Sequence, residues 1–107
     1  MSTSTNFEKA VSIVTGLPKD GPIKPTDEEK LYFYKYFKQG TVGDINTDRP
    51  GMLDFVGKAK WVAWKSVQGT SEEEAQKLYV EKLLEILRKA DDDESKKYID
   101  ALNKINP

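Results

Sequence analysis

The chain has 107 residues, a formal net charge of -1, and neither cysteine nor histidine. This length fits one small domain with a single core, and the charge excludes a global electrostatic attraction to nucleic acid or to acidic membranes. The missing cysteine excludes disulfides and thiol chemistry, and the missing histidine removes the side chain most often used for proton transfer near neutral pH.

The first expected helix covers about residues 5–15, because apolar residues trace one helical face there: Phe7, Ala10, Val11 and Val14, with Ile13 beside them. Gly16 ends this helix. Three prolines and Gly21 within residues 17–25 then predict an extended loop.

The second helix is expected to begin at Thr26, because Thr26 and Glu29 have the spacing of a capping box. It is expected to end at Lys38, before Gly40. Apolar and aromatic side chains surround most of its circumference: Leu31, Tyr32, Phe33, Tyr34, Tyr36 and Phe37. A helix that is apolar on nearly all sides needs packing partners on more than one of them.

Residues 41–51 form a predicted loop, and residues 54–67 form a third helix that ends before Gly69. Ser71 and Glu74 repeat the capping-box spacing at the start of the longest helix. The clearest core face of the chain follows it: Ala75, Leu78, Tyr79, Leu83, Ile86, Leu87 and Ala90.

After residues 91–93 the helical spacing resumes at Tyr98, Ala101, Leu102 and Ile105. The tail is therefore either a continuation of the fourth helix or a short fifth one. No strand pattern and no internal repeat competes with these helices. The expected fold is an all-α helical bundle of one domain, residues 1–107, with a core of about residues 5–90 and a C-terminal extension, residues 91–107.

The N-terminus lacks a basic start and an apolar signal core, and no apolar run approaches the roughly 20 residues that span a bilayer. A cytoplasmic protein without stable membrane insertion is expected.

The loop of residues 41–51 resembles the opening of a calcium-binding loop without completing it. Asp44, Asn46 and Asp48 match its D-x-N-x-D pattern, but Arg49 replaces the required glycine and Phe55 the bidentate glutamate. We interpret these polar side chains as bonding the backbone of their own loop. No metal and no cofactor is expected, since zinc would find neither cysteine nor histidine.

The aromatic residues leave two interpretations open. Aromatic side chains at helical spacing usually form the core, and this interpretation covers Tyr34, Phe37, Trp61, Trp64 and Tyr79. The second helix, however, has more aromatic faces than one core absorbs, and the spacing of Leu31, Tyr34 and Lys38 places them on one surface. Flat rings beside lysines suit a nucleotide or phosphate ester better than a catalytic reaction.

Residues 38–64, KQGTVGDINTDRPGMLDFVGKAKWVAW, closely resemble the acyl-CoA-binding protein family, together with TDEE at residues 26–29 and GTS at residues 69–71. The resemblance covers nearly everything from residue 7 to about residue 89. It implies a four-helix bundle in an up-down-down-up arrangement that binds long-chain fatty acyl-CoA esters without chemistry. The residues that match the ligand positions of the family are Tyr34, Phe37, Lys38, Lys60 and Tyr79, with Leu31 and Ala59 as apolar contacts.

Two features depart from the family pattern. An ungapped alignment from residue 7 puts Thr15 where many members carry a phosphate-binding lysine, and Lys19 or Lys24 in the following loop are the candidates to replace it. The second departure is the extension after residue 89. Its apolar residues are expected to add packing to the last helix, or alternatively to cover a neighbouring surface or partner.

The expected function is binding, buffering and intracellular transport of long-chain acyl-CoA by a monomer that meets acyl-CoA-using enzymes transiently. The alternative is a helical protein-interaction module that has kept the bundle and lost the ligand. An acyl-CoA-processing enzyme would need a nucleophile or base, which the absence of cysteine and histidine disfavours.

Overall fold

The computed structural model describes residues 2–18, 21 and 23–105. These residues form five α-helices and no strand: α1 (Ser2–Thr15), α2 (Asp27–Thr41), α3 (Phe55–Ser66), α4 (Glu72–Ala90) and α5 (Asp93–Ile105). The all-α prediction is confirmed. None of the described helices combines the length and the apolarity that crossing a bilayer requires.

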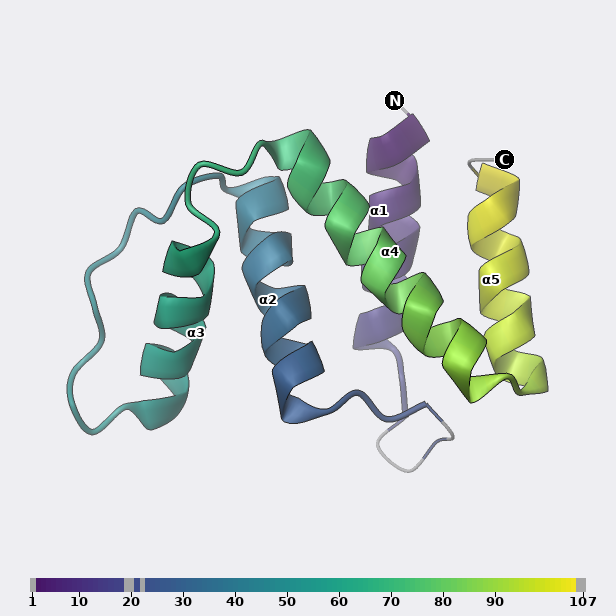
Figure 1. The fold of residues 1–107 in the computed structure, drawn as a ribbon, viewed down its shortest axis with the longest axis horizontal. Coiled ribbons are helices and arrows are strands. Elements are labelled where there is room, and N and C mark those ends of the chain that lie inside the picture. Colours follow the sequence, from purple (N-terminus) through teal and green to yellow (C-terminus); the bar gives the residue numbers. More distant parts are fainter. Residues whose placement is uncertain (1, 19–20, 22, 106–107) are drawn as a thin grey trace.

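The first four helices have the up-down-down-up arrangement that the family resemblance implied. Figure 1 shows α2 and α3 running parallel to each other, with α1 and α4 running in the opposite direction. The helix α4 packs against both α1 and α2, whereas α3 packs against α2 at the edge of the bundle. The helix α3 therefore keeps much of its surface outside the core.

The core lies where α4 crosses α1 and α2. Its buried apolar residues come from α1, the following loop, α2, α4 and α5: Phe7, Ala10, Ile13, Ile23, Phe33, Tyr79, Val80, Leu83, Leu87 and Leu102. Two details differ from the expected faces. In α1, Ile13 is more buried than Val11 and Val14, and at the end of α4 Ala90 is exposed. Ala90 is the last residue of α4, and the left-handed conformation of the next residue, Asp91 (φ 50), ends the helix there.

The start of α2 is as predicted, but its end is not. The backbone N–H of Thr26 donates to Glu29 Oε1 (2.8 Å) and that of Glu29 to Thr26 Oγ1 (3.1 Å), which completes the capping box. Beyond Lys38 the helix continues through Gly40 to Thr41. Gly40 is buried against α4, where Gln76 Nε2 donates to its carbonyl oxygen (2.8 Å), so tertiary packing overrides the glycine signal.

The tail forms a separate fifth helix instead of continuing α4. Asp92 begins it, because its carboxylate accepts the backbone N–H of Ser95 (2.7 Å). The helix α5 turns back beside α4 and contacts α1 as well (Figure 1). Leu102 is 1% exposed, and Tyr98 packs against the core. The extension thus buries its apolar face on its own bundle; the side chain of Ile105 lies outside the described part of the chain.

Asp44 connects the loop between α2 and α3 to two other segments. Its Oδ1 accepts hydrogen bonds from Gln39 Nε2 of α2 (2.9 Å) and from the backbone N–H of Gly69 before α4 (2.8 Å). The expectation that Asp44 bonds the backbone of its own loop is therefore wrong. Within the described ranges, no group of three or more Cys, His, Asp or Glu side chains is placed to hold a metal ion.

The bond from Gly69, followed by the bond from Gln39, lowers the pKa of Asp44 below its ordinary value of 3.8. A carboxyl whose pKa is depressed by folding stabilises the protein above its unfolded pKa, and this contribution disappears as the pH falls through the folded pKa. We therefore expect Asp44→Ala to lower the melting temperature near neutral pH.

The difference between wild type and Asp44→Ala should shrink when the melting temperature is measured at pH values below about 3.8 by circular dichroism. Asp48→Ala, an exposed position in the same loop, is the control and should change little at either pH. If the difference in melting temperature between wild type and Asp44→Ala stayed constant down to acidic pH, the charge of the Asp44 carboxylate would contribute nothing to stability.

Candidate functional site

Tyr34 and Lys60 meet across the seam between the parallel helices α2 and α3. The Nζ of Lys60 lies 5.4 Å from the centroid of the Tyr34 ring. Lys60 is exposed and Tyr34 is half-buried. The ammonium group is attracted to the negative face of the ring, which holds the two side chains together. The structure thus brings together two of the residues that the sequence proposed for one ligand.

Lys38 supplies a second cation on the same side of α2, one helical turn after Tyr34. Its Nζ lies 5.1 Å from the centroid of Trp64, whose ring is buried and whose Nε1 donates to the carbonyl oxygen of Gly43 (2.9 Å). Trp64 was expected only as a core residue. The contact between Trp64 and Lys38 depends on how α3 packs on α2, so no local sequence pattern could predict it.

Neither of these lysines has a carboxylate partner in the part of the chain that the structure describes. The ion pairs found there join Lys82 to Glu85 and Lys96 to Asp91, on α4 and at the start of α5. The charges of Lys38 and Lys60 are therefore not neutralised by neighbouring acids. Ammonium groups without a carboxylate partner, one on each of two packed helices, can donate charge-assisted hydrogen bonds to the oxygens of an anion.

Phe37 and Leu31 place apolar surface beside these cations. Phe37 is half-buried, with its ring centroid 6.3 Å from that of Phe7 in α1, so it spans the distance from α2 to α1. Leu31 is also half-buried, one turn before Tyr34. Rings and aliphatic groups that are only partly covered keep surface on which an apolar or aromatic ligand group can pack.

Ala59 is exposed on α3 and lines a shallow, mostly apolar hollow of about 470 Å³. The other lining residues are Phe55, Lys58, Val62 and Ala63. Sequence reasoning found only Ala59 in this group. The spacing of residues 55, 59 and 62 is that of one helical face, which is the signal that could have identified the rest.

Tyr79 lies on α4 in the core of the bundle and not at the seam of α2 and α3. It is 2% exposed, and its ring centroid lies 5.2 Å from that of Phe7 and 4.9 Å from that of Phe33. Burial raises the pKa of its hydroxyl above the ordinary value of 10.0, so the side chain is neutral. Only the small exposed part of this residue is available to a ligand.

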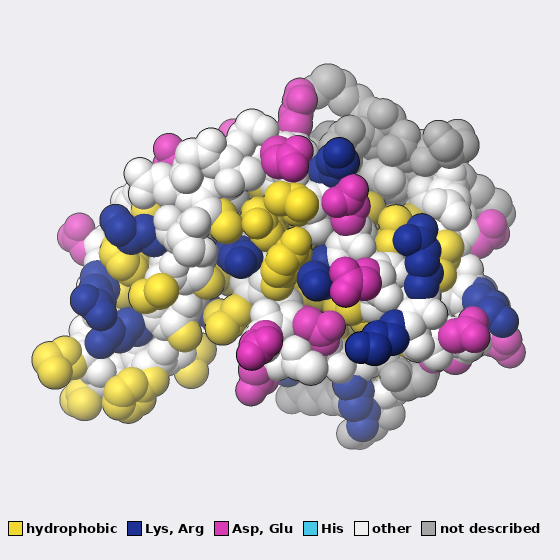
Figure 2. All heavy atoms as spheres, in the orientation of Figure 1, with side chains coloured by type: hydrophobic (Ala, Val, Ile, Leu, Met, Phe, Trp, Pro, Cys, Tyr) yellow, Lys and Arg dark blue, Asp and Glu magenta, His cyan; other side chains and the backbone are white. Residues whose placement is uncertain are grey.

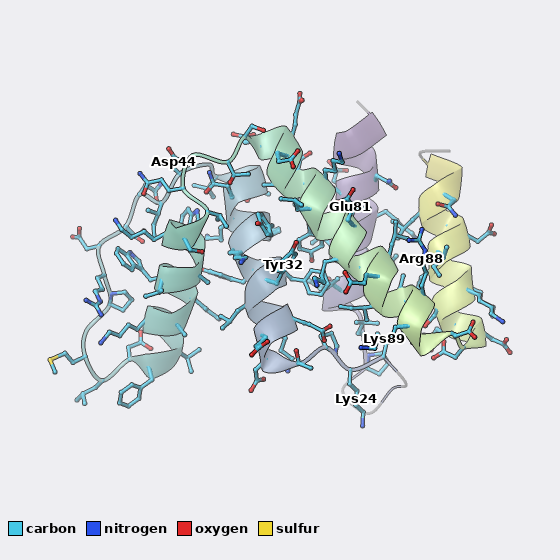
Figure 3. The ribbon with its side chains drawn as sticks, in the orientation of Figure 1. Lys24, Tyr32, Asp44, Glu81, Arg88 and Lys89 are labelled. Atoms are coloured by element: carbon cyan, nitrogen blue, oxygen red, sulfur yellow. The ribbon has the colours of Figure 1, made fainter. Side chains whose placement is uncertain are left out.

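Thr15 and Lys24, two of the residues considered for the missing phosphate contact, lie at the other end of α2. Thr15 is the last residue of α1, and its hydroxyl donates to the carbonyl oxygen of Val11 (2.9 Å), a bond within its own helix. Figure 3 shows Lys24 at the end of the bundle where α2 begins, whereas Lys38 lies near the end of α2. Lys24 and Lys38 therefore do not form one cationic pair, and Lys19 lies outside the described residues.

The sequence and the fold were compared with known proteins. The family model described as acyl CoA binding protein matches residues 4–83. "Acyl-CoA-binding protein homolog 3" of Caenorhabditis elegans is 42% identical over 89 residues, which cover 83% of this chain and 77% of that protein. "Acyl-CoA-binding domain-containing protein 5" of Xenopus tropicalis is 47% identical over 83 residues, which are 78% of this chain but only 18% of that longer protein.

The solved structures with a similar fold include acyl-CoA-binding proteins as well. The crystal structure of an acyl-CoA-binding protein from Moniliophthora perniciosa superposes with a TM-score of 0.93 at 68% identity and covers 94% of this chain and 95% of that one. Acyl-CoA-binding protein 2 of Oryza sativa gives a TM-score of 0.73 at 36% identity over 82% of this chain and 93% of that one. Because the family model covers most of the residues and the bundle has the same arrangement, this chain belongs to the acyl-CoA-binding protein family.

Proposed function

We propose that this protein binds fatty acyl-CoA esters and carries them without chemical change. The observation that carries the proposal is the pair of lysines at the seam of α2 and α3, Lys38 and Lys60, each with its ammonium group over an aromatic ring. Membership of the family supports it independently. The family is one of binding proteins, which supports a carrier in place of an enzyme.

The ribose 3′-phosphate of CoA is the ligand group that fits the lysine pair. A phosphate monoester carries close to two negative charges, and lysines on two helices can donate charge-assisted hydrogen bonds to its oxygens. The hydroxyl of Tyr34 adds a neutral donor beside Lys60. This arrangement would distinguish CoA from analogues that lack the 3′-phosphate.

The adenine ring would stack on Phe37, the half-buried ring between α2 and α1. Stacking of a base on an aromatic side chain contributes roughly 1–3 kcal/mol. Many members of the family have tyrosine at this position, and phenylalanine preserves the stacking surface while it removes the hydroxyl. The adenine contact in this protein therefore rests on stacking alone.

The acyl tail would lie on the apolar surface of Leu31 and Ala59, with the hollow on α3 as its continuation. Each methylene taken out of water contributes about 0.8 kcal/mol, so affinity should rise with chain length until this surface is covered. This supports long-chain esters as the preferred ligands. The ring of Tyr79 would offer only its exposed edge.

We also propose that the carrier acts as a cytoplasmic monomer and meets acyl-CoA-using enzymes only transiently. An exposed Lys60, a half-buried Lys38 and an open hollow allow the ligand to leave without unfolding of the bundle. A ligand held on the surface can be passed on to an enzyme that binds it more tightly.

Titration calorimetry with palmitoyl-CoA and with its 3′-dephospho form tests this proposal. We expect palmitoyl-CoA to bind at least about tenfold more tightly, because the dephospho form loses the charge-assisted bonds to Lys38 and Lys60. Equal affinities would remove the assigned roles of the two lysines. Binding of neither ester would contradict the carrier function and favour a protein-interaction module instead.

A further inference from the structure

A group of exposed apolar side chains lies at the start of α3 and in the loop before it. Leu53 is 89% exposed, Met52 81%, Phe55 72% and Val56 68%. We refer to these four residues as the apolar tip. Figure 2 shows hydrophobic side chains gathered at this end of the molecule. Single exposed apolar residues are ordinary, whereas several large ones close together mark an interaction surface.

Basic residues outnumber acidic ones in the segment that holds the apolar tip and along the rest of α3. Residues 49–66 contain Arg49, Lys58, Lys60 and Lys65 but one acidic residue, Asp54, in a chain whose overall charge is -1. Asp54 is engaged as the N-cap of α3, where its carboxylate accepts the backbone N–H of Gly57 (3.0 Å). Figure 2 shows the Lys and Arg side chains next to the hydrophobic ones on this side of the molecule. The local surface is therefore cationic although the protein is not.

The structure holds this tip outward. The helix α3 packs on α2 at the edge of the bundle, which leaves its first turn free of the core (Figure 1). The loop before α3 is bonded to that helix, because Trp61 Nε1 donates to the carbonyl oxygen of Thr47 (2.9 Å). The hydrogen bond between Trp61 and Thr47 ties the loop to α3, so the apolar tip is held in place by its own helix.

We propose that the apolar tip docks the protein on an anionic lipid surface. Its side chains would enter the interfacial region of the bilayer, while Arg49 and Lys58, the basic residues nearest to the tip in the chain, contact the charged head groups. Apolar side chains next to basic ones are the combination that binds negatively charged membranes reversibly, because each supplies a separate attraction. A second copy of this chain fits less well, since a symmetric contact would bring the basic residues of both copies together.

The apolar tip lies next to the hollow proposed to hold the acyl tail. Phe55 belongs to the apolar tip and also lines the hollow that contains Ala59. A docked protein would therefore present its tail-binding surface to the membrane, where the acyl chains of acyl-CoA insert. The docking itself needs no acyl-CoA, so it does not depend on the proposed carrier function.

Sedimentation of the full chain with lipid vesicles, in the absence of acyl-CoA, tests the proposal. We expect binding to phosphatidylcholine vesicles that contain about one third phosphatidylglycerol, weaker binding to pure phosphatidylcholine, and release by high salt. Leu53→Asp should weaken binding to the anionic vesicles about tenfold, because it removes an inserted side chain and adds a charge repelled by the lipids.

Val42→Asp is the matched control. Val42 is also an exposed apolar residue, but it follows α2 next to Gly43, which contacts Trp64 near the far end of α3. Equal effects of the two substitutions would show that net charge alone governs binding and would overturn the docking assignment. No binding of the wild type to anionic vesicles would also overturn it.

Two further measurements separate the remaining outcomes. Sedimentation velocity without lipid would reveal self-association, and a dimer that Leu53→Asp dissociates would assign the tip to a second copy instead. Calorimetry with palmitoyl-CoA in solution should give the same affinity for wild type and Leu53→Asp. A parallel loss of palmitoyl-CoA binding would place Leu53 in the ligand site and overturn the docking role, whereas loss of vesicle binding alone supports it.

Discussion

Replacing Lys60 with alanine is expected to weaken the binding of palmitoyl-CoA by about 10- to 100-fold, because a hydrogen bond to a charged group is worth about 1.5–3 kcal/mol. The ammonium group of Lys60 lies 5.4 Å from the ring centroid of Tyr34 and is exposed, so its removal leaves the core untouched. Titration calorimetry gives the affinity, and circular dichroism checks that the fold is unchanged.

Lys65→Ala is the matched control for Lys60→Ala. Lys65 is exposed on the same helix, and its Nζ lies 5.2 Å from the ring centroid of Trp61. It therefore makes a cation–π contact as Lys60 does, but with a ring of its own helix instead of a ring of α2. We expect its loss to change the affinity by less than about threefold, as for an exposed charge that does not contact the ligand. Similar losses for both variants would mean a general attraction of the ligand to a basic helix.

The same pair of variants can be titrated with 3′-dephospho palmitoyl-CoA. If Lys60 contacts the 3′-phosphate, Lys60→Ala should have little effect on this ligand, because the group it binds is already absent. An undiminished effect would place Lys60 against another part of CoA. The comparison isolates one interaction between one side chain and one ligand group.

Leu102→Ala is expected to lower the free energy of unfolding by about 2–5 kcal/mol, the range for removal of a buried leucine. Leu102 is 1% exposed and belongs to the same buried cluster as Leu83 and Leu87 of α4. The helix α5 contacts both α4 and α1, so the extension should unfold together with the bundle. Urea denaturation followed by circular dichroism measures the effect.

Lys97→Ala, an exposed position on α5, is the control and should change the free energy of unfolding by less than about 0.5 kcal/mol. An unfolding midpoint of Leu102→Ala equal to that of the wild type would show that α5 is not part of the cooperative unit. The affinity of the folded Leu102→Ala protein for palmitoyl-CoA should be unchanged, because Leu102 lies apart from the seam of α2 and α3.

The all-α fold and the starts of α2 and α4 could be predicted from the sequence because their signals are local. A capping box satisfies the first free N–H groups of a helix with side chains three residues apart, and Thr26 with Glu29 does so in the structure. At Ser71, the hydroxyl accepts the backbone N–H of Glu74 (3.1 Å). The candidate ligand residues on α2 could be grouped in the same way, because helical spacing places Leu31, Tyr34 and Lys38 on one surface.

Other features depended on residues far apart in the chain. The helix α2 runs past Gly40 because α4 packs there, and Asp44 bonds Gly69 because the chain returns to that point before α4. The meeting of Lys60 with Tyr34 likewise needs α3 to lie parallel to α2. No local pattern predicts these contacts.

The sequence by itself determined the helices, most of their starts, and the family to which the chain is similar. Only the tertiary structure decided how completely Tyr79 is buried, that α5 folds back onto α4, and that the apolar tip is exposed. The physical reason is that spacing along a helix shows which residues share a face. Whether that face meets another helix or the solvent depends on how the whole chain packs.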